Sequence, residues 1–259
     1  MQQLRLFFIA LQFFTRLPIP GWVGFQPEWL QHASRYFPLV GCVVAAVAAG
    51  VYALAALVLP APLAAVLSTA ASIYVTGAFH EDGFADTCDG LGGGMTRERV
   101  LAIMKDSRVG AYGAIGIVCM LGVKCTALAM LPPASAIAAL FLAHPLSRLA
   151  ATGLIWRMDY ARDQGKAKPM AQQMHNGEFA IAALTALLPG AVLVATGLLK
   201  PAALMACVGA AALAAFWLAR KFQARLQGYT GDCLGAVQQL AEVAIYLVVV
   251  ASLGHAAIA

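Results

Sequence analysis

Residues 37–59 read FPLVGCVVAAVAAGVYALAALVL and contain no charged side chain. A helix of about 20 apolar residues can cross the ~30 Å hydrocarbon layer of a bilayer, so this stretch predicts a membrane-spanning helix. Because a helix satisfies its own backbone hydrogen bonds in lipid, the whole chain predicts an all-α, polytopic integral membrane helical bundle with about seven transmembrane helices. The other uncharged or nearly uncharged runs lie at residues 62–79, 109–131, 133–155, 179–199, 201–219 and 234–254.

The composition fits a single integral membrane domain over residues 1–259. Hydrophobic residues make up 61% of the chain and charged residues 11%, and no internal repeat divides it. The number of spans is six or seven, because the last run contains Glu242. The six cysteines form no Cys-x-x-Cys pair, which argues against a zinc site or a disulfide framework.

The basic residues fall on one side of the predicted bundle. They precede the first span and occupy alternate connections, whereas the opposite connections contain one charge, Lys200. The positive-inside rule therefore predicts a multi-pass membrane protein with its N-terminus and its polar motifs in the cytoplasm. The net charge of +5 follows from this topology, and no nucleic-acid-binding pattern accompanies it. The residues concerned are Arg5, Arg16, Arg35, Arg97, Arg99, Lys105, Arg108, Arg157, Arg162, Lys166, Lys168, Arg220, Lys221 and Arg225.

The first residues, about 1–16, predict a short amphipathic helix. Phe7, Phe8, Phe13 and Phe14 alternate with glutamines and precede Arg16. The segment is too short to span the bilayer, so it either lies in the membrane interface or packs against the bundle.

The run HEDGFADTCDG at residues 80–90 concentrates four carboxylates in a chain that is otherwise poor in charge. If the helix predicted over 62–79 continues to Asp89, then Asp82, Asp86 and Asp89 stand at i, i+4 and i+7 on one face. Three clustered carboxylates repel one another, and such hard oxygen ligands suit Mg²⁺. The alternative is an acidic helix end that is solvated at the membrane surface.

A glycine-rich turn and a basic segment complete this motif, which covers about residues 80–110. Residues 90–94 (GLGGG) are expected to end the helix, and Thr96 is expected to cap a new helix through Met104. Residues 105–113 (KDSRVGAYG) then lead into the next span. Carboxylates for a metal, nearby cations and a flexible backbone together indicate a phosphate-transferring site.

Further polar residues lie near or within the spans. Asp232 is either a helix cap or a distant member of the same site. Glu242 lies deep in the last span, where an unpaired charge is costly, and pairing with Lys124 is one hypothesis. The loop at 158–177 is either a lid over a substrate or a solvated connection.

Several motifs together resemble the cobalamin synthase family, the adenosylcobinamide-GDP ribazoletransferases. They are the acidic run at 80–90 and the segments FTRLP (14–18), FPLVG (37–41), IMKDSRVG (103–110) and TGDCLGA (230–236). The resemblance implies an enzyme that joins adenosylcobinamide-GDP to α-ribazole, or to α-ribazole 5′-phosphate, and releases GMP with Mg²⁺ as cofactor. It also implies a location in the bacterial cytoplasmic (inner) membrane. It leaves open an association with other enzymes of cobalamin biosynthesis, or a homo-oligomer, in the lipid bilayer.

The resemblance also implies roles for single residues. Asp82, Asp86 and Asp89 are expected to bind the metal, and either Asp106 or Asp89 to act as the general base. Glu81 occupies a position that varies in the family, so it is not expected to be a direct ligand. The residues expected to contact substrate are His80, Arg97, Lys105, Ser107, Arg108 and Asp232.

Two other functions compete with this interpretation. CDP-alcohol phosphotransferases also carry aspartates on a membrane helix, but no aspartate stands three residues before Asp82-Gly83, and Ala85 is followed by Asp86. An ion-coupled transporter could use Glu242 and Lys124, yet transporters commonly contain inverted repeats, which this sequence lacks.

Overall fold

The computed structural model describes residues 1–24, 26–162 and 174–254, and these residues form helices joined by short connections. Within that part of the chain there is no strand, and Tyr160 and Tyr229 form an isolated β-bridge. Residues 163–173 of the loop considered as a lid lie outside the described residues. The elements are α1 Gln2–Phe14, η1 Gly21–Val23, α2 Pro27–Ala33, η2 Ser34–Tyr36, α3 Phe37–Ala55, α4 Ala61–Thr76, α5 Phe79–Gly93, α6 Arg97–Ile103, α7 Ala111–Ala129, α8 Pro133–Arg157, α9 Asn176–Ala195, α10 Pro201–Leu226 and α11 Gly231–Gly254.

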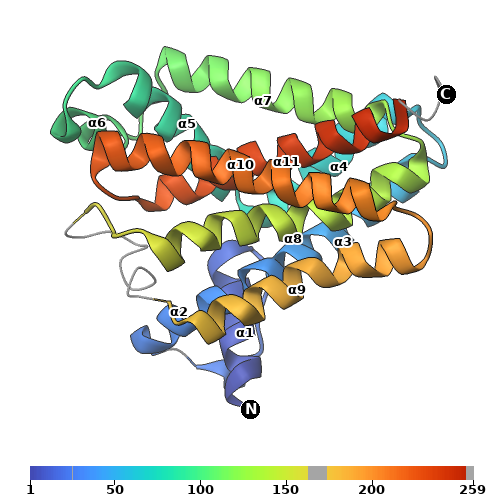
Figure 1. The fold of residues 1–259 in the computed structure, drawn as a ribbon, viewed down its shortest axis with the longest axis horizontal. Coiled ribbons are helices and arrows are strands. Elements are labelled where there is room, and N and C mark those ends of the chain that lie inside the picture. Colours follow the sequence, from blue (N-terminus) through green and yellow to red (C-terminus); the bar gives the residue numbers. More distant parts are fainter. Residues whose placement is uncertain (25, 163–173, 255–259) are drawn as a thin grey trace.

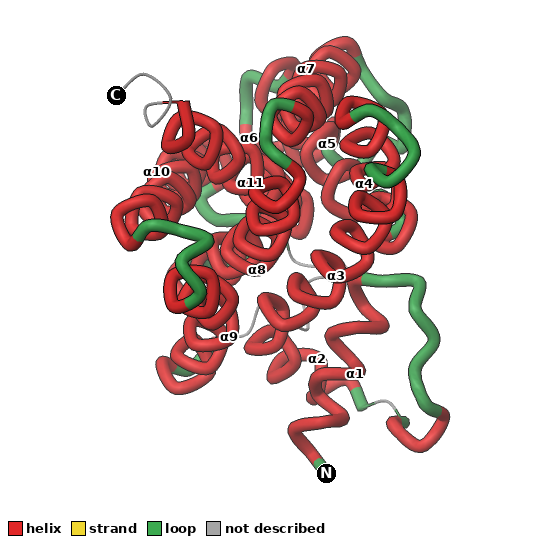
Figure 2. Tube along the Cα trace, turned by 90° about the vertical axis from the view of Figure 1, so that its right-hand side faces the viewer, coloured by secondary structure: helices red, strands yellow, loops and turns green. Residues whose placement is uncertain are grey.

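The long helices run side by side as a membrane bundle (Figure 1), and Figure 2 shows the same bundle from one end. Among the described residues, six helices are long and apolar enough to cross a membrane, and the bent pair α4–α5 makes a seventh if it is one span. The predicted all-α polytopic bundle is therefore confirmed. The six are Trp29–Ala55, Ala111–Ala129, Pro133–Arg157, Asn176–Ala195, Pro201–Leu226 and Gly231–Leu253.

The helix expected to continue from residue 62 to Asp89 is broken. Helices α4 and α5 meet at 90°, because Gly77 and Ala78 both adopt positive φ, at 65° and 60°. The Ala78 N–H donates to Ile73 O at 2.9 Å, and the Gly77 N–H to Tyr74 O at 3.2 Å. This left-handed ending satisfies the last carbonyls of α4 and turns the chain, so one continuous helix was wrong here.

The segment after α1 docks onto this break. The Arg16 N–H donates to Val75 O at 2.8 Å, and the Arg16 guanidinium lies 5.5 Å from the centre of the Tyr74 ring. A side chain at Gly77 would bring its Cβ within 2.9 Å of Arg16 Nε. The first segment of the chain therefore holds the bend that orients α5.

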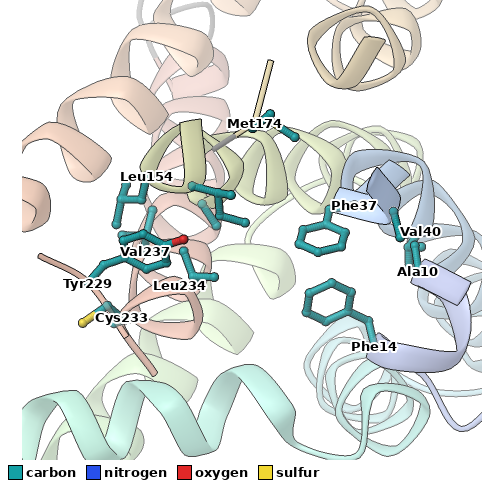
Figure 3. Close-up of a cluster of buried hydrophobic side chains, with 14 of the residues drawn as sticks. Ala10, Phe14, Phe37, Val40, Leu154, Met174, Tyr229, Cys233, Leu234 and Val237 are labelled. Carbon is teal, nitrogen blue, oxygen red and sulfur yellow. The ribbon is translucent and has the colours of Figure 1, made fainter. Parts of the chain in front are cut away.

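Helix α1 packs against the bundle and lies across the direction of the long helices (Figure 1). Its buried face includes Leu6, Ile9 and Phe14. Figure 3 shows Phe14 facing Phe37 of α3, and their ring centroids are 4.4 Å apart in an edge-to-face arrangement. The same apolar cluster reaches the start of α11 at Val237. A position of α1 in the membrane interface stays a prediction.

Candidate active site

Helix α5 has two chemically different faces. Asp82 is exposed and Asp86 is partly buried on one side, whereas His80 and Glu81 are buried among neighbouring helices. Because α5 includes Asp82, Asp86 and Asp89, the expected i, i+4, i+7 spacing does fall on helical residues. The outer face of this helix is the acidic one.

Two glycines bring α5 into close contact with α11. A Cβ on Gly83 would lie 2.9 Å from the backbone oxygen of Asp232, and one on Gly235 would lie 2.9 Å from that of His80. The two backbones can approach this closely because neither glycine carries a side chain. The contact brings Asp232 beside the acidic face of α5.

The carboxyl group of Asp86 lies in a negative environment. Burial, followed by the charges of Asp232 and Asp82, raises the pKa of Asp86 to about 7, and Asp89 acts in the same direction. Arg162 opposes this shift in pKa, and its Nη2 lies 3.0 Å from Asp232 Oδ2. A cation bound at this face would relieve the remaining repulsion between the carboxylates.

Asp89 binds the first turn of α7. The Gly110 N–H donates to Asp89 Oδ2 at 2.7 Å, and the Gly113 N–H donates to Oδ1 at 2.8 Å. Amides at a helix start have no partner within their own helix, and the helix dipole favours an anion there. A Cβ on Gly110 would stand 2.5 Å from Asp89 Oδ1, so this approach requires glycine.

A pocket of about 540 Å³ opens beside Asp89, with walls from α5, α6 and α7. Its charged lining consists of Asp89, Arg99, Asp106 and Arg108, and Tyr112 adds an aromatic side chain. This volume is within the range of small-molecule sites, roughly 300–1,000 Å³. Two guanidinium groups facing one pocket suit the recognition of phosphate groups.

Asp106 and Arg108 form an ion pair with each other at this pocket. Arg108 Nε donates to Asp106 Oδ1 at 3.0 Å and Arg108 Nη2 to Oδ2 at 2.5 Å. These bonds lower the pKa of Asp106 to about 2, so its carboxylate is a weak base while they persist. The Arg108 side chain is 87% exposed, so an incoming phosphate can compete for it.

The other basic residues predicted to contact phosphate differ in position. Arg97 donates from Nε to Leu226 O and from Nη2 to Ala161 O, both at 2.8 Å, and so joins α6 to the end of α10. Lys105 and Ser107 are exposed in the connection between α6 and α7. Thr96 caps α6 through a bond from the Arg99 N–H, as its sequence position predicted.

His80 faces the interior of the bundle. Its ring stacks on that of Phe14, with centroids 5.5 Å apart and planes 14° from parallel, and only 4% of the residue is exposed. It borders a small polar cavity between the helices instead of the 540 Å³ pocket. A substrate contact by His80 therefore stays a prediction that the placement of its ring does not support.

The donor set of the acidic face has the chemistry that Mg²⁺ prefers. Magnesium commonly takes one or two protein carboxylates and fills its octahedron with water and substrate phosphate oxygens. Asp82 and Asp86 offer such carboxylates, and Asp89 stands next to them with both oxygens already accepting amide bonds. Within the described residues, no group of three His, Cys, Asp or Glu side chains is arranged to hold a metal ion. A metal bound to Asp82 and Asp86 would complete its coordination with water and substrate oxygens.

Sequence reasoning did not assign three residues to the site that the structure places there. Arg99 and Tyr112 line the pocket, and Arg162 pairs with Asp232. For Arg99 and Tyr112, the available signal was their position near the glycine-rich segment. Arg162 comes from a distant connection, so local sequence carried no signal for its partner.

Comparison with known proteins agrees with these motifs. A family model described as cobalamin-5-phosphate synthase matches residues 6–250. This chain belongs to the cobalamin-5-phosphate synthase family. The match includes the acidic run, the pocket residues and the start of α11, so the predicted family resemblance is confirmed.

Relatives named adenosylcobinamide-GDP ribazoletransferase match nearly the whole chain. An adenosylcobinamide-GDP ribazoletransferase from Leptothrix cholodnii is 53% identical over 94% of this chain and 94% of its own. Enzymes of the same name from Ralstonia nicotianae and Shewanella frigidimarina are 46% and 44% identical, over 95% and 97% of this chain and 95% and 96% of their own. No solved structure matches the chain.

Proposed function

We propose that this protein is an adenosylcobinamide-GDP ribazoletransferase. The observation that carries the proposal is the basic and acidic pocket formed by Asp89, Arg99, Asp106 and Arg108 in a chain of the cobalamin-5-phosphate synthase family. A ribose hydroxyl of α-ribazole, or of its 5′-phosphate, attacks the pyrophosphate phosphorus that bears cobinamide. One P–O bond forms, the anhydride P–O bond breaks, GMP leaves and the hydroxyl proton is removed.

Arg99 and Arg108 bind the pyrophosphate in this proposal. Guanidinium groups form charge-assisted, bidentate bonds to phosphate oxygens and offset the charge of the leaving nucleotide. Arg108 is largely exposed and is held by one nearby carboxylate. Lys105 and Ser107 flank it in sequence and would contact substrate from the exposed connection, whereas Arg97 would support the pocket wall.

Asp82, Asp86 and Asp89 would hold Mg²⁺ together with phosphate oxygens of the substrate. When bound, the metal would offset negative charge on the phosphates and on departing GMP. Burial and the neighbouring carboxylates raise the pKa of Asp86, so a cation bound at this face would stabilise its ionised form. Asp232 would orient the substrate from the adjoining start of α11.

Asp106 becomes a better base when substrate binds, which favours it over Asp89. In the unliganded protein the bonds from Arg108 lower the pKa of Asp106. Transfer of Arg108 to the pyrophosphate would remove those bonds and allow Asp106 to accept the hydroxyl proton. Asp89 already accepts two amide bonds that no substrate needs to displace, so it is less suited than Asp106 to act as the base.

The site would face the cytoplasm of the inner membrane. The connections at the pocket end of the bundle carry the basic residues, and the opposite connections carry Lys200. No observation of the described residues favours a CDP-alcohol phosphotransferase or a transporter. Association with other pathway enzymes or a second copy stays a prediction.

The test uses detergent-purified protein with adenosylcobinamide-GDP, α-ribazole and Mg²⁺, and chromatography of corrinoids and nucleotides. We expect cobalamin and GMP in equal amounts from the wild-type protein, and no product after chelation or in Asp82→Asn. Folded wild-type protein that forms no product would overturn the assigned activity. Product formation that survives chelation would instead overturn the metal assignment.

A further inference from the structure

A second polar cluster lies inside the bundle, behind the acidic face of α5. It combines side chains from α5 and from α7, α8 and α11, three of the helices able to span a membrane, around a small cavity. Ionisable groups within a membrane bundle are costly unless they are paired or hydrated. The groups that matter are Glu81, Lys124, His144, Arg148, Gln238 and Glu242.

A set of direct bonds centres on Glu242. Lys124 Nζ lies 2.7 Å from Glu242 Oε1, and Gln238 donates to Glu242 Oε2 at 2.6 Å. Lys124 also donates to Gln239 Oε1 at 3.4 Å, and Gln239 Nε2 donates to Glu81 Oε1 at 2.8 Å. A continuous chain of bonds thus links Glu242 to the helix that carries the acidic motif.

Several other polar atoms of the cluster lack partners in the part of the chain that the structure describes, although Arg148 donates from Nη1 to His144 O at 3.0 Å. Arg148 and Glu81 are 3% and 8% exposed, and both line the same small cavity. No direct ion pair joins Arg148 to a carboxylate among the described residues. In the same part of the chain, Arg148 Nε, Glu81 Oε2, Gln238 Oε1 and His144 Nε2 are buried without a hydrogen-bond partner.

The cavity that these residues share has a volume of about 10 Å³, which is roughly the space that one water molecule requires. The charges already balance, since Lys124 and Arg148 offset Glu81 and Glu242, so an additional ion is not needed. The unpartnered atoms instead require a neutral molecule that can both donate and accept hydrogen bonds. We propose that one internal water accepts from Arg148 Nε–H and donates to Glu81 Oε2, completing a water-mediated ion pair between α8 and α5.

This ion pair would orient the acidic motif. Glu81 directly precedes Asp82, so a bond that holds Glu81 inward keeps the next residue on the outer face of α5. Together with the hydrogen bond from Gln239, the water would hold the inner face of α5 at both oxygens of Glu81. Glu81 is then a positioning residue for the carboxylates on the other face.

The direct test is a high-resolution density map of the wild-type protein in a lipid nanodisc. We expect a water peak within hydrogen-bond distance of both Arg148 Nε and Glu81 Oε2. Well-defined side chains with no peak between them, or a direct contact between the two charged groups, would overturn the bridging water.

A double-mutant cycle tests the pairing without a map. Glu81→Gln and Arg148→Met each leave one buried charge uncompensated, so each should lower the Tm by at least about 5 °C. The double variant is neutral again and should lose clearly less than the sum of the two. Strictly additive losses would show that the groups do not interact. If neither single variant can be produced as folded protein, recovery of folded double variant supports the pair. Failure to recover the double variant counts against the pair. Glu98→Gln, at an exposed position of α6, is the control and should leave the Tm unchanged.

An activity assay tests the positioning role, and this part rests on the proposed transferase function. The double variant should fold yet lose about 10-fold or more in kcat, with a smaller change in KM, because misplaced carboxylates affect the reacting geometry most. An unchanged kcat in the folded double variant would overturn the role of Glu81. If the wild-type protein shows no transferase activity, the proposed function fails, while the map and the thermal cycle still decide on the water-mediated pair.

Discussion

Lys124 Nζ lies 2.7 Å from Glu242 Oε1, and the two side chains are 2% and 1% exposed. One comes from α7 and the other from α11, so the pair joins two membrane helices. The hypothesis that these two residues pair is confirmed. Removing one partner leaves a buried charge in a medium that solvates it poorly.

Lys124→Met should therefore destabilise the protein by about 3–5 kcal/mol, which corresponds to roughly 10 °C in Tm. Thermal unfolding in detergent measures this loss. The reversed pair Lys124→Glu/Glu242→Lys should recover part of it, and Lys105→Met, at an exposed lysine, should change nothing. A reversed pair that is no better than the single variant would argue that the two charges are not coupled.

Asp86→Asn should stabilise the metal-free protein at high pH while abolishing turnover. The pKa of Asp86 is raised to about 7 in the folded protein, so its ionised form disfavours folding. The penalty is absent below the ordinary pKa of an aspartate near 4, grows between pH 4 and 7, and is complete above pH 7. Since Asp86 is partly exposed, a gain of roughly 1–2 kcal/mol is expected at pH 8. Thermal unfolding at pH 5 and pH 8 checks it, and an equal effect at both would contradict this origin.

Gly110→Ala should reduce activity strongly. Its Cβ would stand 2.5 Å from Asp89 Oδ1, so the carboxylate must move away from the start of α7. A loss of about 10-fold or more in kcat is expected from displaced groups at a reacting site. Gly122→Ala is the matched control in α7, because nothing lies within 4 Å of a Cβ there. Similar losses in both variants would mean that the helix, and not Asp89, is being perturbed.

Substitutions of Arg97 and of Arg99 should have different effects, the first on stability and the second on substrate binding. Arg97→Ala removes two bonds to backbone carbonyls and should cost about 2–3 kcal/mol of stability. Arg99→Ala should raise the KM for adenosylcobinamide-GDP with little change in Tm, because Arg99 lines the pocket. Steady-state kinetics and thermal unfolding of the two variants give this comparison. If instead Arg97→Ala raised the KM and Arg99→Ala lowered the Tm, the phosphate would lie at Arg97.

Several features were predictable from sequence because they depend on neighbours along the chain. The spans follow from runs of apolar residues, and the start of α6 follows from Thr96 followed by polar helix-forming residues. The pairing of Lys124 with Glu242 was predictable for a different reason: two opposite charges at membrane depth have few other partners.

Other features could not be read from local sequence. The bend at Gly77 and Ala78 needs a non-glycine residue at positive φ, which propensity does not predict. The binding of Arg97 to Leu226 O and Ala161 O depends on backbone atoms far away in sequence. His80 belongs to the acidic run, yet the bend turns its ring inward, onto Phe14.

The sequence alone determined that this protein is a bundle of membrane helices with an acidic, glycine-rich motif, and to which family it is similar. Hydropathy and charge act on each segment separately against lipid and water, so they can be read one segment at a time. Only the tertiary structure decided which carboxylates face the pocket, because that depends on the 90° bend and on glycine contacts between α5, α7 and α11. Those contacts join residues that the chain keeps apart, and their geometry is set when the helices pack.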